Sequence, residues 1–328
     1  MNKYPQVIFG DKIGVGKKTT YNPTNETFFA LDFPLKRKES TWDLFPKKII
    51  IQPEKIFPYS PSFTNYSLPS PIARTDTPDF SQWGEKVNEI IKSPIEKVVL
   101  SRKTTFTFNT LINPIQVIDM LHQRQSNSHV FGILLDPNVA FVGATPELLF
   151  KRNGLHLKTE ALAGTRLLGE EKELLQSNKD LEEFAYVKET LRERLSLISH
   201  PFTISNDVYI KKTIKVCHLH YPFSVNLRKP FSDFALIDHI HPTPAISGLP
   251  DNLALKAITS LEPFDRGLYC GAIGMSLQSN AEVYVGIRSA IVEKNKLHIF
   301  AGAGIVKDSS PEDEWKELEN KISQFGLL

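Results

Sequence analysis

Segments with the composition of β-strands occur in pairs along much of this 328-residue chain, without a regular alternation of strand and helix. They are rich in Val, Ile, Phe and Tyr, which favour extended backbone. Neighbouring parallel strands need a long crossover between them, whereas antiparallel strands are joined by short turns. The pattern therefore predicts an α+β fold of largely antiparallel sheets with helices packed outside. The predicted strands lie at about 97–108, 129–135, 139–143, 155–160, 207–216, 269–277, 281–292 and 296–301.

Helical patterns fill several of the gaps between these strands. The chain is long enough for two average domains or one large one, and 41% hydrophobic residues suffice for a sizeable core. The predicted helices cover about 113–124, 170–199, 232–240, 252–261 and 311–325.

The N-terminal part gives weaker signals. Residues 53–78 contain six prolines, too many for a regular helix or a central strand. We therefore expect irregular chain or a linker there. Short apolar runs at 7–9 and 48–51 predict strands at the edge of a sheet.

Charge and composition argue against several kinds of partner. Thirty-nine basic and 37 acidic residues give a net charge of +2 without a basic stripe, so nucleic acid is not expected. No apolar run is long enough to span a bilayer, and the first residues lack a signal sequence. We therefore expect a cytoplasmic protein with no membrane partner.

Cys217 and Cys270 lie in strand-like stretches, which predicts two buried thiols rather than a disulfide.

A run of small residues near the C-terminus carries the first chemical signal. The sequence FAGAGIV at 300–306 leaves backbone N–H groups unshielded around its two glycines. The helix predicted after it places Glu314, Glu317 and Lys321 on one face, at positions i, i+3 and i+7. Backbone donors beside carboxylates suggest that an anion and a metal ion are held together.

Five further motifs precede this run. Together with FAGAGIV and the following EWKE at 314–317, they resemble, in order and spacing, the motif series of the chorismate-utilising enzymes, and within that family of isochorismate synthases. The resemblance covers about residues 93–328 and is specific. The five motifs are KVVLSR at 97–102, GATPEL at 143–148, EALAGTR at 160–166, HPTPA at 241–245 and EPFDRG at 262–267.

The resemblance implies a single chorismate-binding catalytic domain over residues 1–328, in which two sheets face each other under a layer of helices. Residues 93–328 would form the best-matched catalytic part, after N-terminal strands and a proline-rich segment at 1–92. The implied activity is an isomerase reaction that converts chorismate to isochorismate, with Mg²⁺ as cofactor. Water is added at one ring carbon and the 4-hydroxyl is lost from another. No glutaminase subunit is expected.

Two residues correspond to the family's proton-transfer groups. Lys97 matches the lysine general base and Glu147 matches the general acid that protonates the departing hydroxyl. The two groups would exchange roles in the reverse reaction. Without the resemblance, Lys97 is equally a solvated strand end, and Glu147 a residue favoured at a helix start.

Two acidic helices correspond to the family's metal site. The resemblance implies Glu183 and Glu317 as direct Mg²⁺ ligands, with Glu314 nearby or bound through water. Carboxylate oxygens are the ligands that Mg²⁺ prefers. The alternative is that both are ordinary solvated helix faces.

The substrate's enolpyruvyl carboxylate has implied partners of its own. Arg288 would grip it, because a planar fork of donors suits a carboxylate. Tyr269 and the N–H groups around Gly302 and Gly304 would complete this clamp, and Lys321 would neutralise substrate charge. Arg288 is otherwise an outward charge on an alternating strand.

The nucleophile is indicated by a turn at Ala163, Gly164 and Thr165. A relative that makes aminodeoxychorismate has a lysine at the alanine position, whereas a methyl group leaves room for water. His218 matches a site histidine of the family, although a lone histidine is also often a core residue. His241 is a candidate structural partner.

Phe184 is where the chain departs from the family, which usually has His after the metal-binding Glu of the first helix. Either a hydrogen bond near the metal is lost, or Phe184 packs into the core while Glu183 faces the site.

Two other functions stay open. One is a salicylate synthase, which eliminates pyruvate from isochorismate, and the other is a chorismate-binding protein without turnover. The pathway that uses the product, whether for menaquinone, a siderophore or salicylate, is not indicated.

Overall fold

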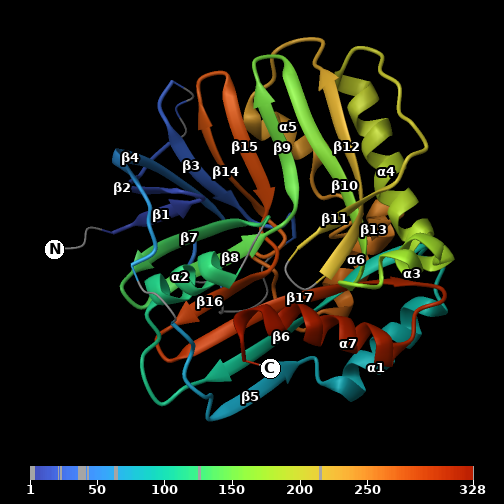
Figure 1. The fold of residues 1–328 in the computed structure, drawn as a ribbon, viewed down its shortest axis with the longest axis horizontal. Helices are drawn as coiled ribbons and strands as arrows, with labels where there is room; N and C mark the ends of the chain where they lie inside the picture. Colours follow the sequence, from blue (N-terminus) through green and yellow to red (C-terminus); the bar gives the residue numbers. More distant parts are fainter. Residues whose placement is uncertain are drawn as a thin grey trace.

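A computed structural model describes residues 4–20, 22, 24–35, 42, 44–62, 66–124, 127–213 and 216–327. Within these residues the strands form one antiparallel, hydrogen-bonded sheet (Figure 1). The strands are β1 (Gln6–Phe9), β2 (Lys12–Lys18), β3 (Thr27–Leu31), β4 (Lys48–Pro58), β5 (Ala73–Thr77), β6 (Lys97–Thr107), β7 (His129–Asp136), β8 (Val139–Thr145), β9 (Leu148–Asn153), β10 (His156–Leu167), β11 (Tyr209–Lys212), β12 (Val216–Asn226), β13 (Gly248–Leu249), β14 (Ala272–Leu277), β15 (Asn280–Val285), β16 (Ser289–Glu293) and β17 (Lys296–Val306).

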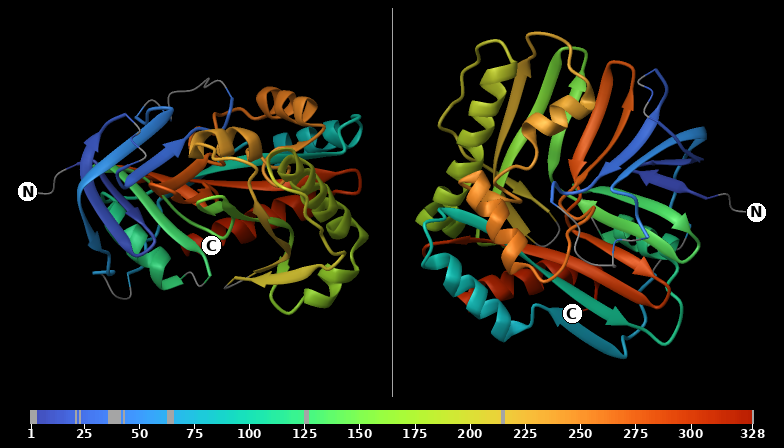
Figure 2. Two further views of the ribbon diagram at one scale, coloured as in Figure 1. Left: turned by 90° about the horizontal axis from the view of Figure 1, so that it is seen from above. Right: turned by 180° about the vertical axis from the view of Figure 1, so that it is seen from behind.

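Helices lie on both sides of this sheet. Helices α2 and α7 cover the face nearest the viewer in Figure 1, and α5 and α6 lie on the opposite face, as the second view of Figure 2 shows. The helices are α1 (Phe80–Ile91), α2 (Pro114–Arg124), α3 (Glu171–Gln176), α4 (Asn178–Ile198), α5 (Asp233–Ile240), α6 (Asp251–Leu261) and α7 (Pro311–Ile322). The predicted α+β class with outer helices is confirmed.

The order of the strands explains how a site can form. Pairing runs from β11 through β12, β10, β9, β15, β14, β3, β4, β2, β1, β7, β8, β16 and β17 to β6. Strands β5 and β13 share the outer side of β6. Helix α4 packs against β10 and β12 near one end of this order and against β17 near the other. The two ends are therefore brought together.

The N-terminal strands join the two halves of the sheet. Strand β3 pairs with β14 of one half, and β1 pairs with β7 of the other. The two facing sheets expected from the family resemblance are thus continuous through β1–β4. The prediction of edge strands at 7–9 and 48–51 is wrong, because β1 and β4 each have a neighbour on both sides.

The proline-rich segment is more regular than predicted. Strand β4 continues to Pro58, and its register against β2 shifts at Pro53, which pairs with Gly16. A bulge of this kind accommodates a proline that cannot donate to the ladder. The expectation of irregular chain throughout 53–78 is therefore wrong for the strand residues at both ends of the segment, in β4 and β5.

Helix α1 was not predicted, although its start has a sequence signature. Asp79 accepts from the N–H of Gln82 at 2.9 Å, and the Gln82 side chain accepts from the N–H of Asp79 at 3.2 Å. This capping box satisfies two backbone donors that a helix start leaves free.

Two predicted elements are divided in the structure. The helix predicted at 170–199 breaks at Ser177, whose hydroxyl caps α4 by accepting from the N–H of Asp180 at 3.2 Å. The strand predicted at 281–292 breaks at Gly286–Arg288, where Arg288 has φ of +51°. The second break places Arg288 in the loop between β15 and β16.

The core is apolar and continuous, and both predicted thiols lie in it. Cys217 and Cys270 are buried and unpaired, as expected. Trp42 fills the space above Gly267, where a Cβ would lie 2.1 Å from the indole ring. In the described part of the chain, no helix is both long and apolar enough to cross a bilayer.

Candidate active site

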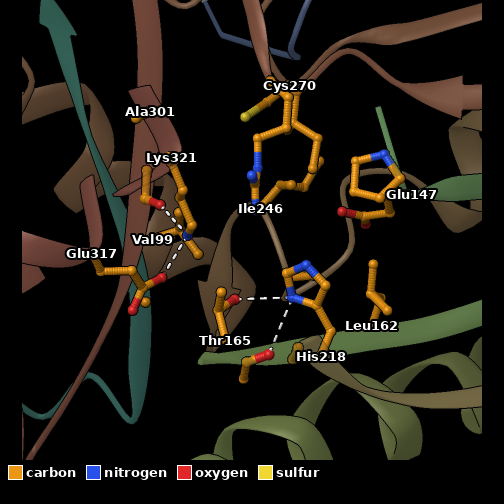
Figure 3. A pocket seen from close by; sticks show the side chains of 18 of the residues that line it. Val99, Glu147, Leu162, Thr165, His218, Ile246, Cys270, Ala301, Glu317 and Lys321 are labelled. Atoms are coloured by element: carbon orange, nitrogen blue, oxygen red, sulfur yellow. Dashed lines mark hydrogen bonds and ion pairs between the residues drawn. The ribbon is translucent and has the colours of Figure 1, made fainter. Parts of the chain in front are cut away.

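One cavity gathers most of the predicted site residues (Figure 3). Strands β6 and β17 form one side, and β10 and β12 the other, so the converging ends of the sheet enclose it. Lys97 and Glu314 are the predicted residues that do not line it. The predicted residues that do are Glu147, Ala163, Gly164, Thr165, Glu183, His218, Tyr269, Arg288, Gly302, Gly304, Glu317 and Lys321.

Glu147 is a buried carboxyl that faces the cavity. It lies in the short connection between β8 and β9, and it is 5% exposed. Burial, followed by the negative charge of Glu160, raises the pKa of Glu147 to about 7. Its Oε1 atom is 3.5 Å from the Thr243 hydroxyl, a long contact. A carboxyl in this state can give or take a proton near neutral pH.

His218 is a neutral imidazole with one nitrogen committed. Its Nδ1 atom lies 3.2 Å from the carbonyl oxygen of Gly164, which can only accept, so Nδ1 carries the proton. Burial and the nearby charges of Arg288 and Lys321 hold the pKa of His218 well below its ordinary value. Its Nε2 atom is buried and has no partner among the described residues, so it is free to accept a hydrogen bond from a ligand.

Lys97 lies behind this cavity, beside Glu183. Its side chain is 0% exposed, and Nζ is 3.0 Å from Glu183 Oε1. This contact is an ion pair without the geometry of a hydrogen bond, and Nζ has no hydrogen-bond partner within the described residues. The amine is therefore held in place by charge while its donors remain unsatisfied, which is a costly arrangement for a merely structural lysine.

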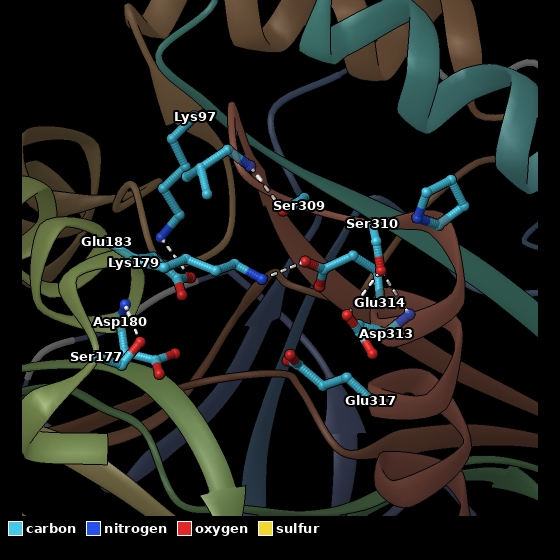
Figure 4. Close-up of polar contacts among 12 residues, drawn as sticks. Lys97, Ser177, Lys179, Asp180, Glu183, Ser309, Ser310, Asp313, Glu314 and Glu317 are labelled. Atoms are coloured by element: carbon cyan, nitrogen blue, oxygen red, sulfur yellow. Dashed lines mark hydrogen bonds and ion pairs between the residues drawn. The ribbon is translucent and has the colours of Figure 1, made fainter. Parts of the chain in front are cut away.

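Carboxylates of α4 and α7 meet lysines where the two helices approach each other, beside Lys97 of β6 (Figure 4). We call this set, formed by Glu183, Glu314, Glu317 and the lysines that contact them, the carboxylate cluster. Lys179 Nζ donates to Glu314 Oε1 at 2.5 Å, and Lys321 Nζ lies 2.5 Å from Glu317 Oε1. Each predicted metal ligand thus has a lysine against it.

The donor set of the carboxylate cluster fits a hard divalent cation. Burial, followed by the charge of Glu317, raises the pKa of Glu314 to about 7, even though Lys179 is in contact. The described residues contain no ready-made group of three or more His, Cys, Asp or Glu side chains around one point. In the structure each of these carboxylates is paired with a lysine, and carboxylate oxygens are the ligands that Mg²⁺ prefers.

Gly304 provides room beside the carboxylate cluster. A Cβ at this position would lie 2.3 Å from Glu183 Oε1 and 3.2 Å from Lys97 Cε. Any larger residue would push Glu183 away, so the small-residue run of β17 is needed for this contact. At Gly302, a Cβ would lie 2.9 Å from the Tyr269 hydroxyl, and the Gly302 carbonyl accepts from Lys321 at 2.6 Å.

Arg288 extends from the loop between β15 and β16 into the cavity lining. Its guanidinium has no hydrogen bond or ion pair with the described residues; burial lowers its pKa, and the charge of Glu317 opposes this effect. A guanidinium without a fixed partner is available to a carboxylate ligand. Tyr269, stacked on Phe300 with ring centroids 5.2 Å apart, lines the same part of the cavity.

Phe184 points into the core and away from the cavity. It is 2% exposed within the main apolar cluster, whereas the neighbouring Glu183 contacts Lys97. Successive helix positions differ by about 100°, so adjacent residues can face core and site. Of the two interpretations of Phe184, the structure supports core packing.

Sequence reasoning missed the partners of several site residues. Thr243 of the HPTPA motif approaches Glu147, and Lys179 of the first acidic helix approaches Glu314, but no role was predicted for either residue. His241, expected to be structural, has its Nε2 atom 2.7 Å from the Cys270 carbonyl oxygen. Contacts between segments that are far apart in the sequence cannot be inferred from residue spacing.

The motif at 262–267 has a structural role. Glu262 accepts from the N–H of Ser101 at 2.9 Å and from the Arg266 guanidinium. Arg266 also donates to the carbonyls of Val99 and Ile246, both at 2.6 Å. This buried ion pair joins strand β6, which carries Lys97, to the loop that borders the cavity.

Several known proteins resemble this chain in sequence. The family model described as chorismate binding enzyme matches residues 19–326. Isochorismate synthase 2 of Arabidopsis thaliana is 38% identical over 269 residues, which are 77% of this chain and 48% of the relative. Isochorismate synthase MenF of Haemophilus influenzae is 37% identical over 258 residues, 75% of this chain and 59% of the relative. The chain thus spans about half the length of the plant relative.

Solved structures share the fold. DhbC of Bacillus anthracis superposes with a TM-score of 0.86 at 27% identity, covering 100% of this chain and 98% of that chain. MenF of Escherichia coli gives a TM-score of 0.83 at 24% identity, covering 99% and 88%. The family model extends over nearly all of the described residues and over the cavity. The chain therefore belongs to the chorismate-binding enzyme family.

Proposed function

We propose that this protein is an isochorismate synthase that isomerises chorismate to isochorismate and depends on Mg²⁺. One observation carries the proposal. A single cavity contains a carboxyl that is partly protonated near neutral pH, and the residue at the nucleophile position is Ala163, which offers no amine. The similarity to isochorismate synthases supports the same activity.

The proposed proton transfers use Lys97 and Glu147. As the general base, Lys97 takes a proton from water as the water oxygen bonds to the ring, and the ring double bonds shift. The bond to the 4-hydroxyl oxygen breaks, and Glu147 gives that oxygen a proton, so that water leaves. One water is added and one is lost, which makes the reaction an isomerisation. In reverse, Glu147 accepts and Lys97 donates.

The other cavity residues would bind and orient chorismate. Arg288 has free donors for the enolpyruvyl carboxylate, and Tyr269 and the backbone around Gly302 and Gly304 border the same space. Lys321 would add positive charge to this clamp. His218 Nε2 would accept a hydrogen bond from a substrate hydroxyl, because its proton is held on Nδ1 by Gly164. Thr165 lies 3.0 Å from the same nitrogen and helps fix the ring.

Glu183, Glu317 and Glu314 would hold the metal. When bound, Mg²⁺ would supply positive charge for a substrate carboxylate and relieve the repulsion among these side chains. Lys97, Lys179 and Lys321 balance those charges in the structure, so they compete with a cation for the same oxygens.

The free, buried thiols of Cys217 and Cys270 support a location in the reducing cytoplasm.

Incubation with chorismate and Mg²⁺, followed by chromatography, tests the proposal. We expect isochorismate from chorismate and chorismate from isochorismate, with loss of both reactions in a chelator. Salicylate with pyruvate as the main product would identify a salicylate synthase, and no product would identify a binding protein without turnover. Either result would overturn the proposed function.

A further inference from the structure

The loop that carries Glu147 is fixed from two neighbouring strands. Glu160 on β10 accepts a hydrogen bond from the N–H of Leu148 at 3.0 Å. Lys211 on β11 donates to the carbonyl oxygen of Pro146 at 2.7 Å. The residues immediately before and after Glu147 therefore each have a charged side chain as their partner.

These two side chains also bind each other. Lys211 Nζ lies 2.7 Å from Glu160 Oε1, and His220 Nε2 on β12 lies 2.9 Å from Glu160 Oε2. Both oxygens of Glu160 are thus occupied. The Glu160 side chain is only 9% exposed, so these contacts are shielded from water and hold their geometry.

The Glu147 loop needs such partners because part of its backbone lies outside the sheet ladder, although the Glu147 carbonyl accepts from the N–H of Val285 at 3.1 Å. Residues 146 and 147 separate β8 from β9, and proline has no N–H to donate. The N–H of Glu147 donates to the Thr145 hydroxyl at 3.2 Å. Buried backbone groups outside a ladder are costly unless another group satisfies them. Glu160 and Lys211 satisfy those on either side.

The same residues account for most of the charge near Glu147. Glu160 from β10 disfavours its ionised form, whereas Lys211 from β11 and Lys97 from β6 favour it. The Cys270 thiol also faces Glu147, from the segment before β14. Thr243 is its neutral neighbour. Lys211 and Glu160 therefore act on Glu147 with opposite signs.

We propose that Lys211 and Glu160 form a positioning pair that aims the Glu147 carboxyl into the cavity and balances the charge around it. Neither residue is assigned a role by the proton transfers described above. The proposal rests on the proposed function of Glu147 as the acid. It predicts that both residues affect turnover more than substrate binding, and that they affect proton transfer in opposite directions.

Four variants test the pair. Lys211→Met removes the donor and charge, Lys211→Arg keeps both, and Glu160→Gln keeps an acceptor without the charge. Lys212→Met is the matched control, because Lys212 follows on the same strand but pairs with Glu171 at 2.8 Å, away from the loop. We expect Lys211→Met to lower kcat by about 10- to 100-fold with little change in KM, since small misplacements are costly in catalysis. Lys211→Arg should recover most of this loss.

The pH profile separates positioning from general damage. In Lys211→Met the alkaline limb of kcat should move to higher pH, by on the order of one unit, because a positive charge near Glu147 is lost. In Glu160→Gln it should move to lower pH, because a negative charge is lost. The double variant should cancel much of the two shifts, and Lys212→Met should show neither shift. Shifts in the same direction, or none, would overturn the proposal.

A pH titration of the Glu147 carboxyl in the ligand-free protein measures the same pKa changes without relying on turnover. The ¹³C resonance of the Glu147 carboxyl, identified by its absence in Glu147→Gln, should show the same opposite shifts. An inactive wild-type protein with these shifts would overturn the proposed function and leave the charge relation supported. An active wild-type protein whose Lys211 and Glu160 variants lack these opposite shifts would overturn only the proposed positioning role. If Lys211→Met does not fold, Glu160→Gln and Lys211→Arg decide the outcome.

Discussion

Glu147 and Glu314 are both buried, and the pKa of each is raised to about 7, but their surroundings differ. Glu147 has no lysine in direct contact among the described residues, and Lys97 and Lys211 act on it only through their charge. Glu314 is in contact with Lys179, and the nearby Glu317 opposes its ionisation. The first arrangement suits a group that exchanges a proton, and the second suits a group that shares a cation.

Glu160 completes this comparison. It is buried like the other two, which by itself raises its pKa, but hydrogen bonds from His220, Lys211 and the Leu148 N–H hold that pKa below the ordinary value. Burial therefore does not decide the state of a carboxyl. Direct donors and neighbouring charges decide it together with burial, and Glu147 has few direct donors.

The largest expected effect is at Glu147. Glu147→Gln should lower kcat in both directions by about 10² to 10⁴, because the proton donor is lost while the shape is kept. Steady-state kinetics from chorismate and from isochorismate measure this change. Thermal unfolding serves as the control, and we expect no loss of stability. Near-normal turnover in either direction would refute the role of Glu147.

In the carboxylate cluster the first effect should be on metal affinity. Glu314→Gln should weaken Mg²⁺ affinity by about 10- to 100-fold, the usual cost of losing a supporting group. Glu317→Gln, which removes a proposed direct ligand, should weaken Mg²⁺ affinity more. Calorimetric titration with Mg²⁺ in the absence of substrate measures both. Unchanged affinity in both variants would show that the cluster does not hold the metal.

The pH dependence distinguishes the two regions. Glu147 donates its proton in the forward direction, so the forward kcat should fall as pH rises through about 7. At saturating Mg²⁺ the fall should approach about tenfold per unit, because the protonated fraction falls by that factor. A stopped assay across this range measures it, with Glu147→Gln as the control that should lack this limb. A forward rate that rises steadily through pH 7 and above would contradict the assignment.

The smallest effect on function should be at Phe184. Phe184→His places a polar ring in the core and should lower the free energy of unfolding by about 2 kcal/mol. The Mg²⁺ midpoint should stay unchanged, because the side chain points away from Glu183. A lower midpoint would mean that position 184 reaches the metal after all.

The parts of the site that follow local periodicity could be predicted from the sequence. Glu314, Glu317 and Lys321 lie on one face of α7 as their spacing indicated. The family resemblance indicated Glu147 and Arg288 as site residues, and both line the same cavity. The roles of these residues remain predictions, because geometry places a side chain without showing what it does.

Contacts between distant strands could not be predicted. Lys211 meets Pro146 from another strand, and no spacing rule connects them. Strands β1–β4 were also underestimated, because their short apolar runs resemble those of edge strands, and only their partners show that they are central. Pro53 obscured β4, since the bulge that accommodates it depends on the neighbouring β2.

The continuity of the sheet has a consequence for the order in which the protein can be made. Ala30 pairs with Ile273 and Lys97 pairs with Val306, so strands synthesised early wait for partners synthesised near the end. Pairings this distant in sequence close slowly, because loop-closure entropy must be overcome before their contacts contribute. The emerging N-terminal half exposes unpaired strand edges during that time. A ribosome-bound chain that ends before β14 should therefore remain sensitive to protease, and the site should form only after most of the chain has been released.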